Sequence, residues 1–340
     1  MADGFRIGVL GATGVVGREF LKILAERRFP VGSLRLLATS RSAGKRVDWG
    51  GKEWTVEETT KKSFRDLDFL FISASGDASR EYAPIAAAEG VIVVDDSSAW
   101  RQDPEVPLVV PEVNPEDLEW HKRLIATPNC STVPLVMAVD AIRKVNPVKR
   151  IIADTYQSVS GTGTAAVEEL RSQVARVMSN DHVEPHVYPH QIAFNLVPEI
   201  DRFLESGYTK EEWKMTMESR KILHDNELPL SATCVRVPVY VSHSEAVHLE
   251  LEHPMEPGDA REILARAPGI KVMDDPTVSL YPTPWHAAGR DEVFVGRVRQ
   301  DSSHPNGLAM WLVSDNLRKG AALNVVQVME ALVQRNLVNA

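Results

Sequence analysis

Hydrophobic positions in the first 130 residues follow two spacings that alternate along the chain. An apolar run over 5–10 has strand character, and apolar residues then recur at the spacing of one helical face: Phe20, Leu21, Leu24 and Ala25. Further apolar runs predict strands at 34–39, 69–73, 91–94 and 124–126, with a helix over 77–89. Strands that alternate with helices indicate an α/β fold with a Rossmann-like, doubly wound parallel sheet.

The pattern changes near residue 147, where longer strands begin. They are predicted at 149–158, 232–241, 246–251, 292–299 and 308–314, and one helix near 259–267 lies among the last four. Strands of this kind favour a second, α+β domain with an antiparallel or mixed sheet. We therefore expect a nucleotide-binding domain over 1–130 and a second domain over 131–315. Residues 316–337 return to helical spacing and are expected to pack back on the first domain, and 180–190 is expected to be a loop.

Length and composition agree with two globular domains. The chain has 340 residues, of which 44% are hydrophobic and 25% are charged. We expect a cytoplasmic protein, because no basic segment precedes an apolar stretch at the N-terminus and no run approaches the roughly 18 apolar residues that span a bilayer. Cys130 and Cys234 are then expected to be reduced thiols. The net charge of −9 argues against nucleic-acid binding and requires local Arg or Lys for any anionic substrate.

A glycine-rich turn, Gly11-Ala12-Thr13-Gly14-Val15-Val16-Gly17, joins the first strand to the first helix. Its spacing is G-x-x-G-x-x-G, and glycines of this kind let a pyrophosphate approach the backbone at a helix N-terminus. A structural turn is the alternative. The position at the opening of a βαβ unit favours a dinucleotide site.

The end of the second predicted strand discriminates between NAD and NADP. An acidic residue there would bind a ribose 2′-hydroxyl, but the chain has Ser40, Arg41 and Ser42. An arginine between two serines suits a 2′-phosphate, so the sequence favours NADP(H) over the alternative of a solvated basic loop.

Cys130 follows a short strand and precedes an apolar helix in the segment Thr127-Pro128-Asn129-Cys130-Ser131-Thr132-Val133-Pro134. A helix N-terminus favours the reactive thiolate, and Pro134 is tolerated only in a first turn. Cys130 is therefore the candidate nucleophile, against the alternative of a buried structural thiol, whereas Cys234 lies within an apolar strand and is expected to be structural. A thiolate beside a nicotinamide interconverts a thiohemiacetal and a thioester, and its acyl acceptor could be water, phosphate or coenzyme A.

Several longer motifs resemble those of the aspartate-semialdehyde dehydrogenase family in its bacterial form. They run from about residue 5 to residue 336: GATGVVG, SSAWRQDPEVPLVVPEVN, TPNCSTVP, DTYQSVSGTG, PHQIAFNLVPEID, EEWKMTMESRKIL and CVRVPVYVSHSEAV. The resemblance implies the reversible, NADPH-dependent reductive dephosphorylation of L-aspartyl 4-phosphate to L-aspartate 4-semialdehyde in lysine, threonine and methionine biosynthesis. It also implies a substrate and dimerisation role for the second domain, within a homodimer or a homotetramer, and phosphate as the acyl acceptor.

The resemblance also assigns roles to single residues. Cys130 matches the acyl-thioester nucleophile, Gln157 a substrate contact beside the thiol, and His243 the acid/base histidine, with an unperturbed pKa near 6.5 suited to proton exchange. Arg236 matches the ligand of the substrate α-carboxylate. The other substrate-binding matches are Arg101 and Lys221 for phosphate, Asn129 nearby, and Glu218 for the substrate ammonium group. The cofactor-binding residues expected from the turn and the resemblance are Gly11, Thr13, Gly14, Val15, Val16, Ser40, Arg41, Ser42, Ser73, Ser160, Gly161 and Asn316.

Simpler interpretations differ in strength among these residues. An unpaired arginine within an apolar strand is costly, so function is favoured for Arg236. Without the resemblance, His243 would be an ordinary loop histidine, and Glu218 and Lys221 would be a surface ion pair on a helix. Ser75 departs from the family pattern, which has Gly or Ala there, and is expected to affect cofactor affinity only.

Other functions are less consistent with the sequence. No metal site is expected from His182, His186 and His190, because Pro185 and Pro189 interrupt the helix that would align them. An N-acetyl-glutamyl-phosphate reductase shares the cysteine chemistry but has a different cysteine motif. A thiol hydrolase would leave the nucleotide turn unexplained. A catalytically silent nucleotide-binding relative would be expected to lack the nucleophile or its partners.

Overall fold

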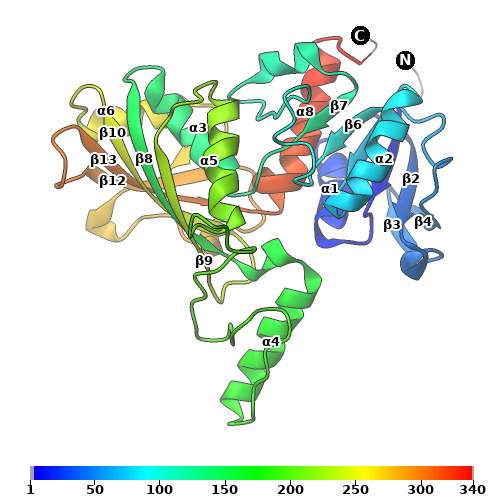
Figure 1. Cartoon of the computed structure of the whole chain (residues 1–340), viewed down its shortest axis with the longest axis horizontal. Coiled ribbons are helices and arrows are strands. Elements are labelled where there is room, and N and C mark those ends of the chain that lie inside the picture. Colours follow the sequence, from blue (N-terminus) through cyan, green and yellow to red (C-terminus); the bar gives the residue numbers. More distant parts are fainter. Residues whose placement is uncertain (1–3, 339–340) are drawn as a thin grey trace. The chain divides into compact units, whose positions relative to one another are not determined.

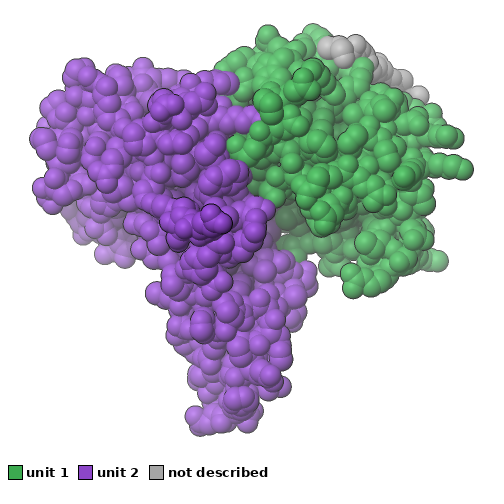
Figure 2. All heavy atoms as spheres, viewed as in Figure 1, with its two compact units in different colours: residues 1–129, 321–340 green, residues 130–320 purple. Residues whose placement is uncertain are grey.

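The chain forms two compact units in the computed structural model, which describes residues 4–338 (Figure 2). Unit 1 comprises 1–129 together with 321–340, and unit 2 comprises 130–320. Unit 1 is therefore discontinuous in the sequence, since its last helix follows the whole of unit 2.

Unit 1 contains a seven-stranded sheet with the strand order β3-β4-β2-β1-β5-β6-β7 (Figure 1). Its strands are β1 (Phe5–Leu10), β2 (Val31–Ala38), β3 (Arg46–Trp49), β4 (Lys52–Glu58), β5 (Phe69–Ile72), β6 (Ile92–Asp95) and β7 (Leu124–Ala126). All neighbours are parallel except β3 and β4. The sheet is the predicted doubly wound one, with the chain turning from β1 to β2 on one side and later to β5 on the other. The hairpin of β3 and β4 was not predicted.

Three helices complete unit 1: α1 (Val15–Glu26), α2 (Gly76–Ala88) and α8 (Leu323–Gln334). The apolar face of α8 is part of the same buried cluster as α1 and the sheet, with Val325, Met329 and Leu332 close to fully buried. Arg27, just after α1, forms a bidentate ion pair with Glu330 of α8 at 2.6 and 2.8 Å. The segment predicted as one helix over 316–337 begins instead with a π-helical turn, Arg318–Ala322.

Unit 2 contains a six-stranded mixed sheet, as predicted, with the order β11-β12-β13-β10-β8-β9. The strands are β8 (Val148–Gln157), β9 (Leu230–Arg236), β10 (His243–Leu251), β11 (Ile270–Val272), β12 (Val293–Gln300) and β13 (Gly307–Ser314). The predicted strand 232–241 ends at Arg236, because Pro238 lacks the N–H that would continue the ladder. The strand predicted from residue 246 begins at His243, so His243 is a strand residue and not a loop residue.

Alternating burial along β8 separates the two faces of this sheet. Ala153, Thr155 and Gln157 are buried, while Tyr156 is exposed on the opposite face. The helices α3 (Thr132–Arg143), α5 (Lys210–Ile222) and α6 (Pro257–Arg266) pack against the sheet and beside one another. The short helix α7 (Pro284–Ala287) precedes β12.

Helix α4 (Thr164–Met178), which was not predicted, extends away from the sheet of unit 2 (Figure 1). It has a small apolar core of its own that includes Ala166, Leu170, Tyr188 and Ile192. Residues 180–190 after it contain neither helix nor strand, as expected. Within the described part of the chain, no helix is long and apolar enough to cross a membrane.

Candidate active site

The glycine-rich turn is built for close backbone approach. Gly11 has φ +95°, and a Cβ on it would lie 2.0 Å from the carbonyl oxygen of Ser73. A Cβ on Gly17 would lie 2.4 Å from the carbonyl oxygen of Gly11. Gly14 caps α1 without any side chain over the first turn, so the helix N-terminus next to Thr13, Val15 and Val16 presents bare N–H groups. These features fit the pyrophosphate of a dinucleotide.

The other cofactor residues expected in unit 1 lie at the same edge of its sheet. Ser40, Arg41 and Ser42 form a 3₁₀ turn directly after β2, with the Arg41 side chain exposed. Ser73 directly follows β5, the neighbour of β1 on the other side. Since carboxyl ends of parallel strands share one edge, the residues that follow β1, β2 and β5 are brought together.

Ser75 has a structural reason for its departure from the family pattern. It is the N-cap of α2, and its Oγ accepts a hydrogen bond from the Ala78 N–H at 3.3 Å. A capping serine stabilises the start of a helix by about 1 kcal/mol relative to alanine.

Arg101 lies in the loop after β6, also at the carboxyl edge of the unit 1 sheet. Its guanidinium donates through Nη2 to the carbonyl oxygen of Asp96 at 2.8 Å, and its side chain is largely buried. The buried Asp95 carboxylate accepts from Ser79 Oγ and Ser97 Oγ at 2.8 and 2.7 Å and so holds the start of that loop. Asn129, the other polar residue expected here, is buried after β7.

Cys130 stands two residues before α3, as the sequence predicted, and no disulfide joins it to Cys234. Its side chain is partly exposed, whereas Cys234 is fully buried. Gly320, in the π-helical turn, approaches Cys130 so closely that a Cβ on Gly320 would lie 2.9 Å from Cys130 Cβ. The nucleophile is therefore supported on one side by bare backbone.

Three of the predicted catalytic and substrate residues lie in one row across the unit 2 sheet. Gln157 pairs with Arg236 between β8 and β9, and His243 pairs with Ser314 between β10 and β13. All four side chains are buried. We call Arg236, Gln157, His243 and Ser314 the polar row.

The hydrogen bonds of His243 determine its tautomer. Its Nδ1 lies 3.0 Å from the main-chain N of Ser158 and 3.1 Å from Ser158 Oγ. Because a main-chain amide can only donate, Nδ1 is an acceptor and the proton of the neutral ring is on Nε2. Nε2 is buried and makes no hydrogen bond within the described residues.

Burial, followed by the nearby positive charge of Arg236, lowers the pKa of His243 to about 3. The expectation of an unperturbed pKa near 6.5 is therefore wrong, because the ring is enclosed in a strand and not exposed in a loop. His243 in the resting protein is a neutral donor through Nε2.

Arg236 and His243 face a small space beside Gly161. A Cβ on Gly161 would lie 3.2 Å from both Arg236 Nη1 and His243 Nε2. Arg236 Nη1 donates to the carbonyl oxygen of Ser158 at 2.7 Å, while its Nε is buried and lacks a partner among the described residues. The two donor groups that meet beside Gly161, Arg236 Nη1 and the unpartnered His243 Nε2, are suited to the oxygens of a bound anion or oxyanion.

Asn316 lies between this space and the π-helical turn whose Gly320 contacts Cys130. Its Oδ1 accepts from Ser158 Oγ, Ser160 Oγ and the Ser242 N–H at 3.2, 3.1 and 2.9 Å. Gly320, which abuts Cys130, is four residues further on. The structure thus gathers Ser160, Gly161 and Asn316 with His243, although their expected contacts with a cofactor remain a prediction.

An acidic and a basic residue that were not predicted lie beside the polar row. Gln157 Nε2 donates to Glu211 Oε1 at 3.3 Å, and Lys214 Nζ lies 3.1 Å from Glu211 Oε2 and 2.8 Å from Asp201 Oδ2. Glu218 and Lys221 have the same spacing but lie two helical turns further along α5. Sequence reasoning passed over Glu211 and Lys214, although EEWK and ESRK in this helix carry the same i, i+3 pattern.

A second buried row lies beneath the polar row and contains Cys234, Thr155 and Glu245. Burial raises the pKa of Cys234 well above its usual range, which disfavours a thiolate and agrees with a structural role. Glu245 is buried with neither carboxyl oxygen hydrogen-bonded within the described chain, and burial raises its pKa well above the usual range. Burial therefore favours the protonated form of Glu245.

Comparison with known proteins identifies the class to which this fold and site belong. Residues 6–121 match the family model described as semialdehyde dehydrogenase, NAD binding domain, and residues 139–319 match semialdehyde dehydrogenase, dimerisation domain. The class to which this chain belongs is therefore that of the semialdehyde dehydrogenases.

Individual relatives narrow the class further. The chain is 51% identical to the aspartate-semialdehyde dehydrogenase of Aquifex aeolicus and 45% identical to that of Bacillus subtilis, over 98% and 99% of this chain and the full length of each relative. The crystal structure of aspartate semialdehyde dehydrogenase II of Vibrio cholerae, complexed with ASA, superposes with a TM-score of 0.95 at 42% identity, covering 98% of this chain and 99% of that one. A Candida albicans relative solved with NADP has a TM-score of 0.77 at 26% identity, over 98% and 99% of the two chains. The chain belongs to the aspartate-semialdehyde dehydrogenase family.

Proposed function

We propose that the chain catalyses the reversible, NADPH-dependent reductive dephosphorylation of L-aspartyl 4-phosphate to L-aspartate 4-semialdehyde and phosphate. The observation that carries the proposal is the unpartnered Nε2 of His243 beside Arg236 and Gly161, in the same unit as a cysteine placed before a helix. Whole-chain identity of 51% to a relative of that name supports the choice of substrate. The product would enter amino-acid biosynthesis.

Cys130 acts as the nucleophile in this proposal. Its thiolate, favoured by the N-terminus of α3, attacks the acyl carbon and the C–O bond to phosphate breaks, so that a thioester remains on Sγ and phosphate leaves with a proton taken from solvent. When bound, NADPH supplies the hydride that reduces the thioester to the aldehyde, and Gly11, Gly14 and Arg41 would hold its phosphates. The product leaves as the aldehyde while Cys130 returns to the thiolate, so the reduction consumes no proton from the enzyme.

His243 stabilises the negative charge that develops on the reacting oxygen. A neutral imidazole that donates through Nε2 can do so without transferring its proton, and burial strengthens that hydrogen bond. This role requires no transfer of the proton, in keeping with burial, which lowers the pKa of His243 in the resting protein.

Substrate groups other than the acyl carbon require their own ligands. Arg236 suits the α-carboxylate, because a guanidinium binds a carboxylate through two parallel hydrogen bonds. We propose Glu211 for the ammonium group, through its position beside Gln157, and Lys214, which lies 3.1 Å from Glu211, for phosphate. Arg101 stays a predicted phosphate ligand. Asn129, Glu218 and Lys221 remain predicted substrate contacts.

The proposal is tested by following NADP reduction at 340 nm with aspartate semialdehyde, with and without phosphate. We expect reduction to require phosphate and to be lost in Cys130→Ala, with Cys234→Ala as the matched cysteine control that keeps activity. NAD in place of NADP should give a much higher KM. Phosphate-independent turnover, or full turnover in Cys130→Ala, would contradict the proposed reaction.

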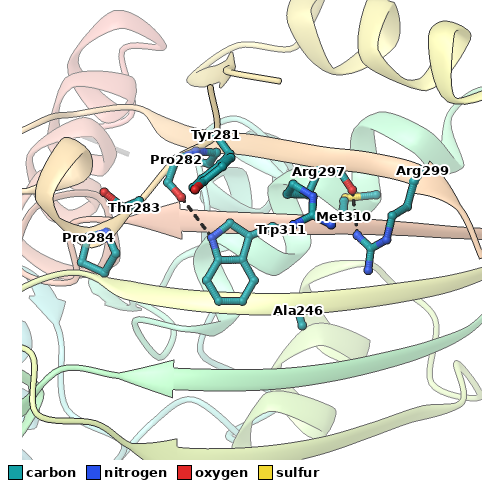
Figure 3. A pocket seen from close by; sticks show the side chains of 9 residues that line it. All are labelled: Ala246, Tyr281, Pro282, Thr283, Pro284, Arg297, Arg299, Met310 and Trp311. Atoms are coloured by element: carbon teal, nitrogen blue, oxygen red, sulfur yellow. Dashed lines mark hydrogen bonds between the residues drawn. The ribbon is translucent and has the colours of Figure 1, made fainter. Parts of the chain in front are cut away.

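We further propose that the enzyme is cytoplasmic, because a catalytic thiol must stay reduced, and that it assembles as a homodimer or a dimer of such dimers through the outer face of the unit 2 sheet. Tyr156 is 37% exposed there and contacts the Trp311 ring at a centroid distance of 5.4 Å. Trp311 also borders a pocket with Tyr281, Pro282 and Arg297, and its Nε1 donates to the carbonyl oxygen of Pro282 at 3.1 Å (Figure 3).

Sedimentation velocity tests the proposed assembly. Wild type should sediment as a dimer or larger, and Tyr156→Asp should sediment as a monomer, because a buried unpaired charge is costly. Trp120→Asp, at an exposed position in unit 1, is the control and should not dissociate. A monomeric wild type would overturn the proposed assembly.

A further inference from the structure

The segment after α4 is held in place by two buried side chains of that helix. Glu169 Oε2 accepts from the N–H groups of His186 and Val187 at 2.9 and 2.6 Å. One turn later, Gln173 Oε1 accepts from the N–H groups of Ile192 and Ala193 at 2.9 and 3.1 Å. Irregular backbone that is fixed at two points is costly to order, and one of the four residues between these points has contacts that suggest a function.

Tyr188 is that residue, and it points toward the polar row. It is 9% exposed and packs with the small apolar core of α4. Its hydroxyl donates to Thr162 Oγ1 at 2.9 Å. Thr162 ends the 3₁₀ turn Val159–Thr162, which also carries Ser160 and Gly161.

The ring of Tyr188 faces the guanidinium of Arg236, with Arg236 Cζ 5.9 Å from the ring centroid. A cation at that distance from an aromatic face is attracted by the ring quadrupole. Arg236 Nη1 is held separately by the carbonyl oxygen of Ser158. The ring contact and the hydrogen bond restrain the guanidinium at two places and leave Nε without a partner on the described chain.

The plane of a guanidinium decides which carboxylates it can bind. Two parallel N–H···O bonds form only when the carboxylate lies in that plane, so a tilt of the guanidinium weakens both bonds at once. A bulky ring that packs beside the guanidinium opposes this tilt. Arg236 alone, with a single main-chain acceptor at Nη1, would retain rotation about that hydrogen bond.

We propose that Tyr188 is a positioning residue that sets the plane of the Arg236 guanidinium for the substrate carboxylate and ties it, through Thr162, to the turn that carries Gly161. Glu169 and Gln173 hold Tyr188 in place, which gives α4 a role in substrate recognition although it lies away from the sheet. Because the carboxylate role of Arg236 belongs to the proposed function, the role of Tyr188 rests on that proposal.

Two substitutions at Tyr188 separate its contacts. Tyr188→Phe keeps the ring and loses the hydroxyl, so KM for aspartate semialdehyde should rise less than about threefold. Tyr188→Leu loses the ring as well, and KM should rise about tenfold, while kcat and the KM values for NADP and phosphate stay within about twofold. The matched control Tyr208→Leu, at an exposed position of the same unit, should behave as wild type.

The rate of Cys130 alkylation by iodoacetamide without substrate should be unchanged in every variant, which excludes a general loss of structure.

A double-mutant cycle with Arg236→Lys identifies the path through which Tyr188 acts. In the Arg236→Lys background the effect of Tyr188→Leu should largely disappear, because contacting residues are not additive. Substrate affinity in weakly active variants is measured as protection of Cys130 from alkylation by aspartate semialdehyde. If Arg236→Lys raises KM and Tyr188→Leu keeps its full effect in that background, or has no effect in wild type, the role of Tyr188 is overturned. If Arg236→Lys leaves KM unchanged, the proposed carboxylate ligand fails and the role of Tyr188 fails with it.

Discussion

The enclosed imidazole of His243 makes the stability of the protein depend on pH in a defined direction. Its pKa falls from 6.5 in the unfolded chain to about 3 in the folded protein, because of burial first and the charge of Arg236 second. Between pH 6.5 and 3 the unfolded chain therefore binds more protons than the folded one. The stability associated with neutral His243 is complete above pH 6.5 and is lost as the pH falls below it.

The size of the effect follows from the shift. Each pH unit below 6.5 costs about 1.36 kcal/mol, so at pH 5.0 the penalty is about 2 kcal/mol. In His243→Gln this titration is absent. The free energy of unfolding should therefore fall by about 2 kcal/mol more in wild type than in His243→Gln when the pH is lowered from 7.5 to 5.0.

Urea unfolding followed by tryptophan fluorescence at the two pH values measures this difference, because the titration of all other groups cancels between the two proteins. His190→Gln, at an exposed position, is the matched control and should follow wild type. Equal losses of stability in wild type and His243→Gln would refute the neutral, enclosed imidazole and with it the assignment of the proton to Nε2.

Three further predictions concern other residues. Gly320→Ala should slow both turnover and alkylation of Cys130 about tenfold or more, since its Cβ would stand 2.9 Å from Cys130 Cβ, while NADP binding measured by fluorescence is retained. Arg41→Asp should raise KM for NADP about 10- to 100-fold and lower KM for NAD, because a carboxylate repels the 2′-phosphate and accepts from the 2′-hydroxyl. Glu245→Gln should stabilise the protein more at pH 8 than at pH 5, as judged by thermal unfolding, because the raised pKa of Glu245 makes the unfolded chain lose a proton that the folded one keeps.

Each of these has a distinct contrary outcome. Normal alkylation in Gly320→Ala would mean that the π-helical turn does not support the nucleophile. An unchanged KM for NADP in Arg41→Asp would remove Arg41 from the cofactor site. A gain in Glu245→Gln that shrinks as the pH rises would mean that Glu245 is ionised in the folded protein.

Residues with strong local patterns were predictable from the sequence. The turn Gly11–Gly17 and the position of Cys130 before α3 were predicted from residues that end a strand and begin a helix, such as glycine and proline. Such signals depend on only a few neighbouring residues. The β3–β4 hairpin had a comparable signal, because Gly50 and Gly51 both adopt positive φ between two alternating segments. It was missed because its strands are short, charged and mostly exposed.

Features that depend on packing were not predictable in the same way. The state of His243 results from burial and from the Ser158 amide, neither of which is local in sequence. Glu211 and Glu218 occupy equivalent positions in two i, i+3 patterns of one helix, so the pattern alone does not reveal that Gln157 donates to Glu211. Tyr188 lies in a segment without periodicity, where its importance comes from contacts made by α4.

The return of α8 to the first unit has a consequence during synthesis on the ribosome. Residues of α8 such as Val325, Met329 and Leu332 belong to the core of unit 1, whereas unit 2 is continuous over 130–320. Domains fold as units while the chain emerges from its N-terminus. Unit 2 is thus built from consecutive residues, while the unit that begins the chain keeps an uncovered apolar surface until α8 has emerged. A truncation that removes α8 should leave nascent chains whose dinucleotide unit is trapped by chaperones or degraded, although every residue of the glycine-rich turn is present.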